Sequence, residues 1–207
     1  ILAAGKGTRM CSNIPKVLHT LAGRPLMEYA LDLGLDICSM PPIVVVGFES
    51  EKVQECIGDR AKVVYQESQL GTGHALNQTA GVLCGQADMI VVWAADMPLL
   101  SNETLQSVVN CQIENEGPIS IVTTVSNDDR GFGKVIRSEF GEVQAIVEKS
   151  DATAEQLSIN ELNVGVYCFR SLWLWDELSA LKPSANGEYY LTDLIKSASL
   201  QDEKIGV

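Results

Sequence analysis

The sequence lacks the marks of several classes of protein. It has no CxxC pair, and only two histidines could join its six cysteines in a metal site. Isolated cysteines among apolar residues behave as small hydrophobes, so we expect buried free thiols and not zinc ligands or disulfides. The cysteines are Cys11, Cys38, Cys56, Cys84, Cys111 and Cys168.

Long apolar runs are also missing. No stretch approaches the roughly 20 apolar residues that a membrane-spanning helix needs. The sequence does not open with a basic segment, a short apolar stretch and a small-residue cleavage site, which is the pattern of a secretory leader. These two absences predict a cytoplasmic protein that does not enter a membrane.

Positive charge is scarce, with 15 lysines and arginines against 27 acidic residues and a formal net charge of −12. A nucleic-acid surface needs clustered lysine and arginine, so this balance argues against a nucleic-acid-binding protein. The distribution is uneven, because no acidic residue precedes Glu28, whereas Lys6, Arg9, Lys16 and Arg24 lie in that first stretch. We therefore expect the first 27 residues to bind an anion.

The 207 residues contain no internal repeat and no linker rich in glycine, proline or serine, so we expect one domain over residues 1–207. Short β-branched runs alternate with helical stretches, which is typical of an α/β fold with a mixed, mainly parallel sheet flanked by helices. The predicted strands of this part are Ile43–Val46, Lys62–Tyr65, Met89–Trp93 and Ile119–Val125, and the predicted helices are Pro25–Ile37 and Ser101–Ile113.

The pattern changes after Val125. Strands are predicted at Lys134–Arg137, Glu142–Val147 and Val164–Phe169, and they would extend the sheet and wall off a space for a sugar. Ile1–Ala4 forms a short first strand without an initiating methionine, and Lys204–Val207 resembles a strand that begins as the chain stops. We expect the domain to be truncated at both ends.

A glycine-rich loop follows the first strand in the segment LAAGKGTRM, Leu2–Met10. Gly5 and Gly7 let backbone N–H groups approach phosphate oxygens, and Lys6 and Arg9 supply positive charge. The spacing is neither that of a dinucleotide fingerprint nor that of a Walker loop. It predicts a phosphate-binding loop, and the alternative is a tight turn that binds no ligand.

Lys16 follows Pro15 among apolar residues. Such a lysine is more often a solvated surface residue. Beside the glycine-rich loop, however, Lys16 is suited to hold a triphosphate or an incoming phosphate.

The segment QESQLGTGHA, Gln66–Ala75, leaves a strand and opens a helix. The Gln66 amide can donate to and accept from the edge of a base, and Gly71 with Thr72 can present main-chain groups to the same edge. The alternative is a glycine turn in which Thr72 caps the helix, and the two interpretations are compatible.

Asp96 ends the apolar run that starts at Met89. The carboxyl edge of a parallel sheet is the usual place to hold a divalent cation beside phosphates, so Asp96 is the predicted metal ligand. The alternative is that Asp96 caps a turn before Pro98.

Together these motifs resemble the uridylyltransferase (pyrophosphorylase) domain family of the bifunctional N-acetylglucosamine-1-phosphate uridylyltransferase and glucosamine-1-phosphate acetyltransferase. The resemblance covers essentially the whole chain. Its motifs are LAAGKGTRM, PKVLHTLAGRP, QLGTGHA, RGFGKV (Arg130–Val135), IVE (Ile146–Glu148), ELNVG (Glu161–Gly165) and NGEYYLTD (Asn186–Asp193).

The resemblance implies a Rossmann-like nucleotide-diphospho-sugar transferase fold. It also implies a reaction of UTP with N-acetylglucosamine 1-phosphate that gives UDP-N-acetylglucosamine and pyrophosphate, with Mg²⁺ held by Asp96 and only small molecules as partners. Arg9 and Lys16 would be catalytic. The implied nucleotide contacts are Leu2, Ala3, Ala4, Gly5, Lys16, Gln66, Gly71 and Thr72. The implied sugar contacts are Gly133, Glu148, Asn163, Tyr190 and Thr192.

The sequence departs from the family in three ways. The acetyltransferase half is absent, the segment with a second metal-binding asparagine has no match before Val207, and Ala95 stands where the family usually has glycine. We expect the Ala95 methyl group to lie close to the substrate. The alternatives are a relative that uses another sugar phosphate, a molybdopterin-type nucleotidyltransferase, or a nucleotide-sugar binding module without turnover. The oligomeric state is not predicted.

Overall fold

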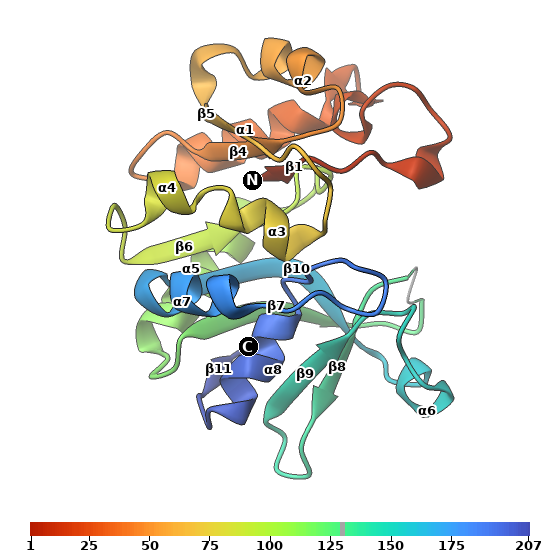
Figure 1. Cartoon of the computed structure of the whole chain (residues 1–207), viewed down its shortest axis with the longest axis vertical. Helices are drawn as coiled ribbons and strands as arrows, with labels where there is room; N and C mark the ends of the chain where they lie inside the picture. The colour runs from red at the N-terminus through yellow and green to blue at the C-terminus, as the bar shows by residue number, and fades with distance from the viewer. Residues whose placement is uncertain (129–130) are drawn as a thin grey trace.

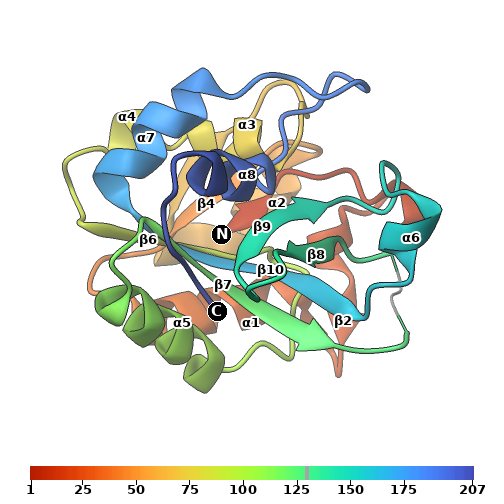
Figure 2. The same cartoon turned by 90° about the horizontal axis from the view of Figure 1, so that it is seen from below.

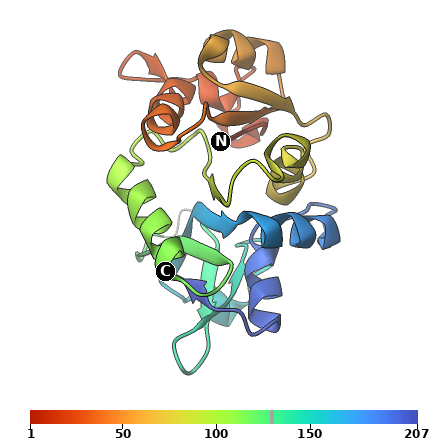
Figure 3. The same ribbon diagram turned by 90° about the vertical axis from the view of Figure 1, so that its left-hand side faces the viewer.

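The computed structural model describes residues 1–128 and 131–207, and the Arg9 side chain lies outside that description. Two halves are stacked along the long axis of the molecule, the upper one containing the N-terminus and the lower one the C-terminus (Figure 1). Helix α5 runs beside the boundary between them (Figure 3), where it contacts α1 of the upper half and β7 of the lower half.

The strands are β1 (Leu2–Ala3), β2 (Thr20–Leu21), β3 (Arg24–Pro25), β4 (Ile43–Val46), β5 (Lys62–Tyr65), β6 (Met89–Val92), β7 (Ile119–Val125), β8 (Lys134–Arg137), β9 (Val143–Val147), β10 (Glu161–Arg170) and β11 (Ile205–Gly206). The α-helices are α1 (Leu26–Ile37), α2 (Ser50–Ile57), α3 (Thr72–Asn77), α4 (Ala80–Leu83), α5 (Asn102–Glu114), α6 (Ala154–Leu157), α7 (Ser171–Ala180) and α8 (Asp193–Leu200). Single turns of 3-10 helix cover Thr8–Met10, Lys16–Leu18 and Gly58–Arg60.

Strand β1 joins the two halves of one mixed sheet. Leu2 pairs with Val45 of β4, its N–H donates to the Trp93 carbonyl (2.9 Å), and its carbonyl accepts from the Ala95 N–H (3.0 Å). The order in space is therefore β5-β4-β1 and then β6-β10-β7-β11, linked by the isolated parallel bridge of Leu2 with Ala94 just after β6, and the β8–β9 hairpin is attached to β10. The predicted mixed sheet is confirmed. Its parallel pairs lie mainly in the upper half, because β10 runs antiparallel to both β6 and β7.

Most predicted elements are found close to their predicted ends. Pro25 precedes α1, and the Ser101 hydroxyl caps α5 by accepting from the Thr104 N–H (3.2 Å). Strand β10 is longer than predicted, because its polar start at Glu161–Asn163 pairs with β7 and continues the ladder. The strand predicted near the end of the chain is confirmed as β11, which runs parallel to β7.

Helices cover both faces of the sheet. Helices α3, α4, α7 and α8 lie on one side, and α1 and α5 lie on the other (Figure 2). Apolar side chains that are fully buried, such as Met27 and Leu31 of α1 and Leu174 of α7, fill the space between the layers. No helix in residues 1–128 or 131–207 is both long enough and apolar enough to cross a membrane.

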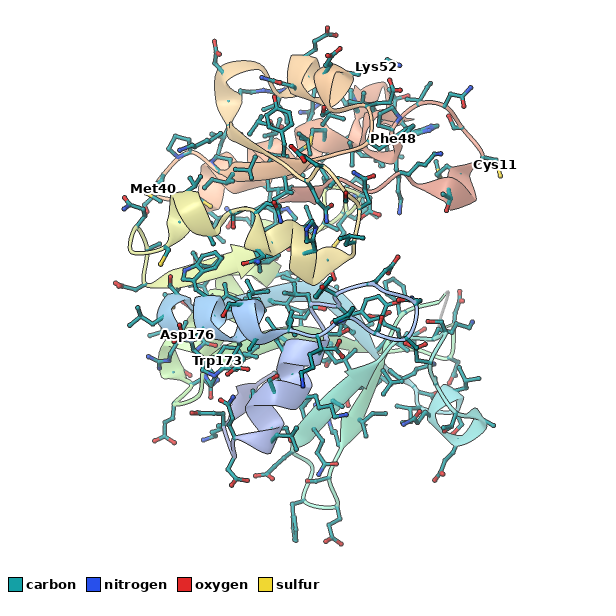
Figure 4. The ribbon with its side chains drawn as sticks, viewed as in Figure 1. Cys11, Met40, Phe48, Lys52, Trp173 and Asp176 are labelled. Atoms are coloured by element: carbon teal, nitrogen blue, oxygen red, sulfur yellow. The ribbon has the colours of Figure 1, made fainter. Side chains whose placement is uncertain are left out.

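The prediction for the cysteines is only partly right. All six are free thiols, and Cys168 is buried. Cys11, Cys38 and Cys84, however, are exposed, and Figure 4 shows Cys11 at the outer end of the loop after β1. Each of these three directly follows a helix or a helical turn, where the connecting segment lies at the protein surface. Apolar neighbours in sequence therefore did not ensure burial.

Three hydrogen bonds tie the start of α3 to the segment before α8. The Tyr189 N–H donates to the Leu70 carbonyl (2.8 Å), and the Tyr189 carbonyl accepts from the Gly73 N–H (2.8 Å). The Leu191 N–H donates to the Thr72 hydroxyl (3.0 Å). We call this set the 70–191 latch. The alternative in which Thr72 caps the helix is wrong, because Gly71 takes the cap position, without a side-chain bond, and Thr72 is the first residue of α3.

Gly71 makes the latch possible. Its φ is +97°, and a β-carbon there would lie 2.5 Å from the Tyr189 carbonyl oxygen. Only glycine combines this backbone conformation with so close an approach.

We predict that Gly71→Ala lowers the free energy of unfolding by about 2–4 kcal/mol, because it adds a backbone clash to the strain of a positive φ. The matched control is Gly141→Ala, where φ is +85° but a β-carbon meets nothing within 4 Å. The control should cost only about 1 kcal/mol. Urea denaturation measures both values, and equal losses would contradict the role given to the latch.

Candidate functional site

Two residues predicted to bind the nucleotide and the predicted metal ligand follow three parallel strands at the same edge of the sheet. Gly5 comes after β1, Gln66 comes directly after β5, and Asp96 comes after β6. Ligands of open α/β sheets bind outside the carboxyl ends of the strands, where loops and helix starts converge. The topology thus brings these three predicted groups to one edge.

The glycine-rich loop brings Lys16 against Asp96. Gly7 has a φ of +65°, and a β-carbon there would lie 2.7 Å from Lys16 Cβ, so the loop packs directly on this lysine. The Lys16 ammonium forms an ion pair with the Asp96 carboxylate, and the two side chains are 41% and 25% exposed. Lys16 is therefore more than a solvated surface lysine.

Two other basic residues belong to the same loop. The Lys6 ammonium lies 5.4 Å from the centre of the Phe48 ring, and Figure 4 shows Phe48 beside this loop. Arg9 lies in the turn Thr8–Met10, and its predicted catalytic side chain is outside the described part of the chain.

The four residues from Leu2 to Gly5, which are predicted to contact the nucleotide, differ in how accessible their backbone groups are to a ligand. Both backbone groups of Leu2 are engaged in the sheet, Ala3 is buried in β1, and the Ala4 carbonyl accepts from the Phe48 N–H (3.1 Å). Gly5 is exposed, and its surroundings are open. Of this set, Gly5 has the most accessible backbone.

Ala95 does not lie where the sequence predicted. Its side chain is 1% exposed and belongs to the core cluster that contains Val17 and Trp93. The methyl group therefore fills the core and does not stand on a surface that a substrate reaches.

The predicted base-reading residue is held by its own loop. Gln66 is 3% exposed, and its amide nitrogen donates to the Gly71 carbonyl (3.1 Å) and lies 2.9 Å from His74 Nδ1. Sequence reasoning missed His74, although it stands in the same motif. Its place on the first turn of α3 could have identified it, because from there the side chain faces back toward the end of β5, where Gln66 lies.

Three predicted sugar contacts line one cavity of about 500 Å³ next to β9 and α8: Glu148, Tyr190 and Thr192. The Thr192 hydroxyl donates to the Glu148 carboxylate (3.1 Å). Burial raises the pKa of the Glu148 carboxyl, and the hydrogen bond from Thr192 opposes the rise. Asp151 and Lys196 also line the cavity, and sequence reasoning did not name them.

The other two predicted sugar contacts lie next to one another. The Gly133 carbonyl accepts from the Asn163 N–H (2.9 Å), and a β-carbon on Gly133 would lie 3.7 Å from a Glu148 oxygen. The Asn163 side chain donates to the Tyr167 hydroxyl (2.7 Å) and accepts from the Gly165 N–H (3.1 Å). Asn163 is 7% exposed, so its amide is largely engaged inside the protein.

A bulge in β10 makes this contact between Asn163 and Tyr167. Asn163 pairs with Thr123 and Tyr167 pairs with Ile121, so between these pairs three residues of β10 oppose one residue of β7. In a regular strand, residues four apart are separated by about 13 Å. The bulge, with Gly165 at a φ of +84°, brings their side chains into a hydrogen bond.

We predict opposite effects of removing two carboxylates. Burial raises the pKa of the Glu148 carboxyl in the folded state above the ordinary value of 4.5. The folded protein therefore loses stability as the pH rises from 4.5 to the raised pKa, because the buried carboxyl must give up its proton. Glu148→Gln should therefore raise the unfolding temperature near pH 7 by about 2 °C and change nothing well below pH 4.5.

Glu161 provides the reversed control. Its hydrogen bond with Arg137 lowers the pKa of the Glu161 carboxyl. The negative charge of Glu161 therefore stabilises the folded state at pH values above the ordinary pKa of a glutamate side chain. Glu161→Gln should lower the unfolding temperature near pH 7. Thermal unfolding at pH 7 and pH 3.5 measures both variants, and changes of the same sign at pH 7 would contradict the assignment.

Comparisons with known proteins agree with this arrangement. Residues 1–197 match the MobA-like NTP transferase domain family. The bifunctional protein GlmU of Heliobacterium modesticaldum is 40% identical over 215 residues, which cover 99% of this chain and 47% of that protein. The protein of the same name from Geotalea daltonii is 41% identical over 201 residues, covering 96% and 44%. The chain thus spans less than half the length of these relatives, and the family resemblance inferred from the motifs is confirmed.

Solved structures support the fold. UDP-glucose pyrophosphorylase complexed with UDP-glucose superposes with a TM-score of 0.71 at 18% identity, over 99% of this chain and 88% of that chain. The apo form of a UDP-glucose pyrophosphorylase gives 0.72 at 19% identity, over 99% and 87%. At this identity the match shows the nucleotide-diphospho-sugar transferase fold alone. Because the family match takes in 197 of the residues, the chain belongs to the MobA-like NTP transferase domain family.

Proposed function

We propose that this chain joins N-acetylglucosamine 1-phosphate to UTP, giving UDP-N-acetylglucosamine and pyrophosphate. The observation that carries the proposal is the ion pair of Lys16 with Asp96 beside the glycine-rich loop. A cation and an acid at this edge suit a triphosphate that arrives with a divalent metal ion. The family match and the relatives named bifunctional protein GlmU support the same class of reaction.

The chemistry needs no general base from the protein. A phosphate oxygen of the sugar phosphate attacks the α-phosphorus in line, the new P–O bond forms, and the bond to the bridging oxygen breaks as pyrophosphate leaves. This nucleophile is already ionised at neutral pH, because the second pKa of a phosphate monoester is about 6. Catalysis then rests on alignment and on the positive charges of Arg9 and Lys16.

We propose Mg²⁺ as the cofactor, held by Asp96. The Asp96 carboxylate supplies the oxygen ligand that this ion prefers, and Mg²⁺ at phosphoryl sites is commonly held by one or two carboxylates together with phosphate oxygens and water. Among the described residues, no group of three histidine, cysteine, aspartate or glutamate side chains gathers to hold a metal alone. When bound, the ion would neutralise charge on the triphosphate.

The sugar is proposed to occupy the side of the cavity where Glu148 and Thr192 meet. A carboxylate and a hydroxyl can accept from and donate to ring hydroxyls. Tyr190 is proposed to offer an aromatic face to the ring, and Gly133 and Asn163, which lie next to one another near Glu148, are proposed to contact the sugar from outside this cavity. UTP and the sugar phosphate are the only partners proposed, and a UTP-consuming enzyme is proposed to work in the cytoplasm, where nucleoside triphosphates are held.

We predict that the chain releases pyrophosphate from UTP and N-acetylglucosamine 1-phosphate with Mg²⁺, and that Asp96→Asn and Lys16→Ala each lower kcat/KM by 100-fold or more. The control is Lys52→Ala. Lys52 lies on α2 at the far end of the upper half (Figure 4) and pairs with Glu49 (2.6 Å). This variant should stay within twofold of the parent chain in a coupled pyrophosphate assay. UDP-N-acetylglucosamine binding without pyrophosphate release would instead identify a binding module without turnover.

A sugar panel separates the remaining alternatives. We expect N-acetylglucosamine 1-phosphate to be used at least tenfold better than glucose 1-phosphate or glucosamine 1-phosphate, measured as kcat/KM. A better rate with another sugar phosphate, or with a molybdopterin substrate, would replace the proposed substrate and keep the reaction type.

A further inference from the structure

The contacts of Gln66 define which of its groups remains for a ligand. A glutamine amide has two N–H hydrogens and one oxygen. One hydrogen donates to the Gly71 carbonyl at 3.1 Å, and the same nitrogen lies 2.9 Å from His74 Nδ1. If both hydrogens are used in this way, the oxygen is the group left to meet a base.

The second contact depends on the state of the His74 ring. A neutral imidazole accepts a hydrogen bond at one nitrogen and donates from the other. Nδ1 makes the shorter contact, whereas Gln78 reaches Nε2 at 3.3 Å and donates to the His74 backbone carbonyl at 3.0 Å. Both ring nitrogens thus face an amide nitrogen that can donate, and the shorter contact favours Nδ1, which faces Gln66, as the accepting nitrogen.

The position of the ring is itself constrained. His74 lies in the first turn of α3, directly after Gly73, whose N–H is part of the 70–191 latch. Its ring also lies 6.2 Å from the ring of Tyr189, centre to centre. The latch and this ring contact hold the imidazole toward the strand end that bears Gln66.

We propose that His74 is a positioning residue that sets base specificity, because its Nδ1 holds the Gln66 amide with the oxygen outward. This inference rests on the proposed function. Uracil carries an N–H donor at N3, whereas cytosine carries a lone pair there. An outward amide oxygen attracts the N3–H of uracil and repels the N3 lone pair of cytosine, so the arrangement selects uridine over cytidine nucleotides.

Equilibrium binding tests the proposal without relying on turnover. The dissociation constants of UTP and CTP with Mg²⁺ are measured by calorimetry, and the ratio of the CTP value to the UTP value is the readout. The parent chain should give a ratio above 10. His74→Leu, which removes the acceptor, should lower this ratio at least fivefold. His74→Asn, whose side-chain oxygen can stand where Nδ1 stood, should restore most of it.

Two further variants separate positioning from general damage. Gln78→Leu removes the contact with the other ring nitrogen and should leave the ratio within twofold of the parent. In a Gln66→Leu background, His74→Leu should have no further effect on the ratio, because the residue it positions is gone. Equal weakening of UTP and CTP by His74→Leu, or the same change of ratio in both backgrounds, would overturn the proposal.

Failure of the proposed function is distinguishable from failure of this inference. A chain that binds UTP selectively but releases no pyrophosphate keeps the role of His74 and loses the reaction. A chain that releases pyrophosphate equally well from UTP and CTP keeps the reaction type and overturns the role of His74.

Discussion

The main-chain pairing of Tyr189 with the loop at Leu70–Gly73 is the constraint on which the rest of the site depends. The loop carries the residues proposed to meet the base, and the segment that follows Tyr189 carries Thr192, which donates to Glu148. The two regions are more than a hundred residues apart in sequence. The three hydrogen bonds of the latch fix both regions relative to one another. Gly71 is needed for the same reason, since no other residue fits so close to the Tyr189 carbonyl.

Charged side chains are distributed unevenly over the molecule. The chain is strongly acidic, yet its first 27 residues carry only positive charge, and Lys16 from that stretch meets Asp96, which follows β6. In the lower half the main acid of the cavity, Glu148, is partly withdrawn from water, which raises its pKa. A protein seldom keeps a carboxyl group in such a place for stability alone, because a neutral side chain of the same shape would cost less.

Much of the fold could be predicted from local pattern. The β-branched runs become β4, β5, β7 and β8 at the predicted bounds, since β-branched residues favour strands. Sites that depend on contacts between distant segments could not be predicted in this way. Thr72 bonds Leu191 and does not cap its helix, Tyr167 meets Asn163 only through a bulge, and the Ala95 methyl group faces the core. The exposed cysteines were missed because sequence neighbours do not show where a chain leaves a helix.

The bulge in β10 also separates two lengths of the strand that pair differently. Before it, Glu161–Asn163 pair with β7 and carry a predicted sugar contact, whereas after it Tyr167–Phe169 pair with both β6 and β7 in the middle of the sheet. The two additional residues absorb local changes of length and direction, so the strand beyond them keeps its register. Sequence variation at the sugar end of β10 can therefore accumulate without disturbing the layer of strands that supports the nucleotide edge. A single glycine-containing irregularity thus divides the strand into a part that carries Asn163 and a part held in the middle of the sheet.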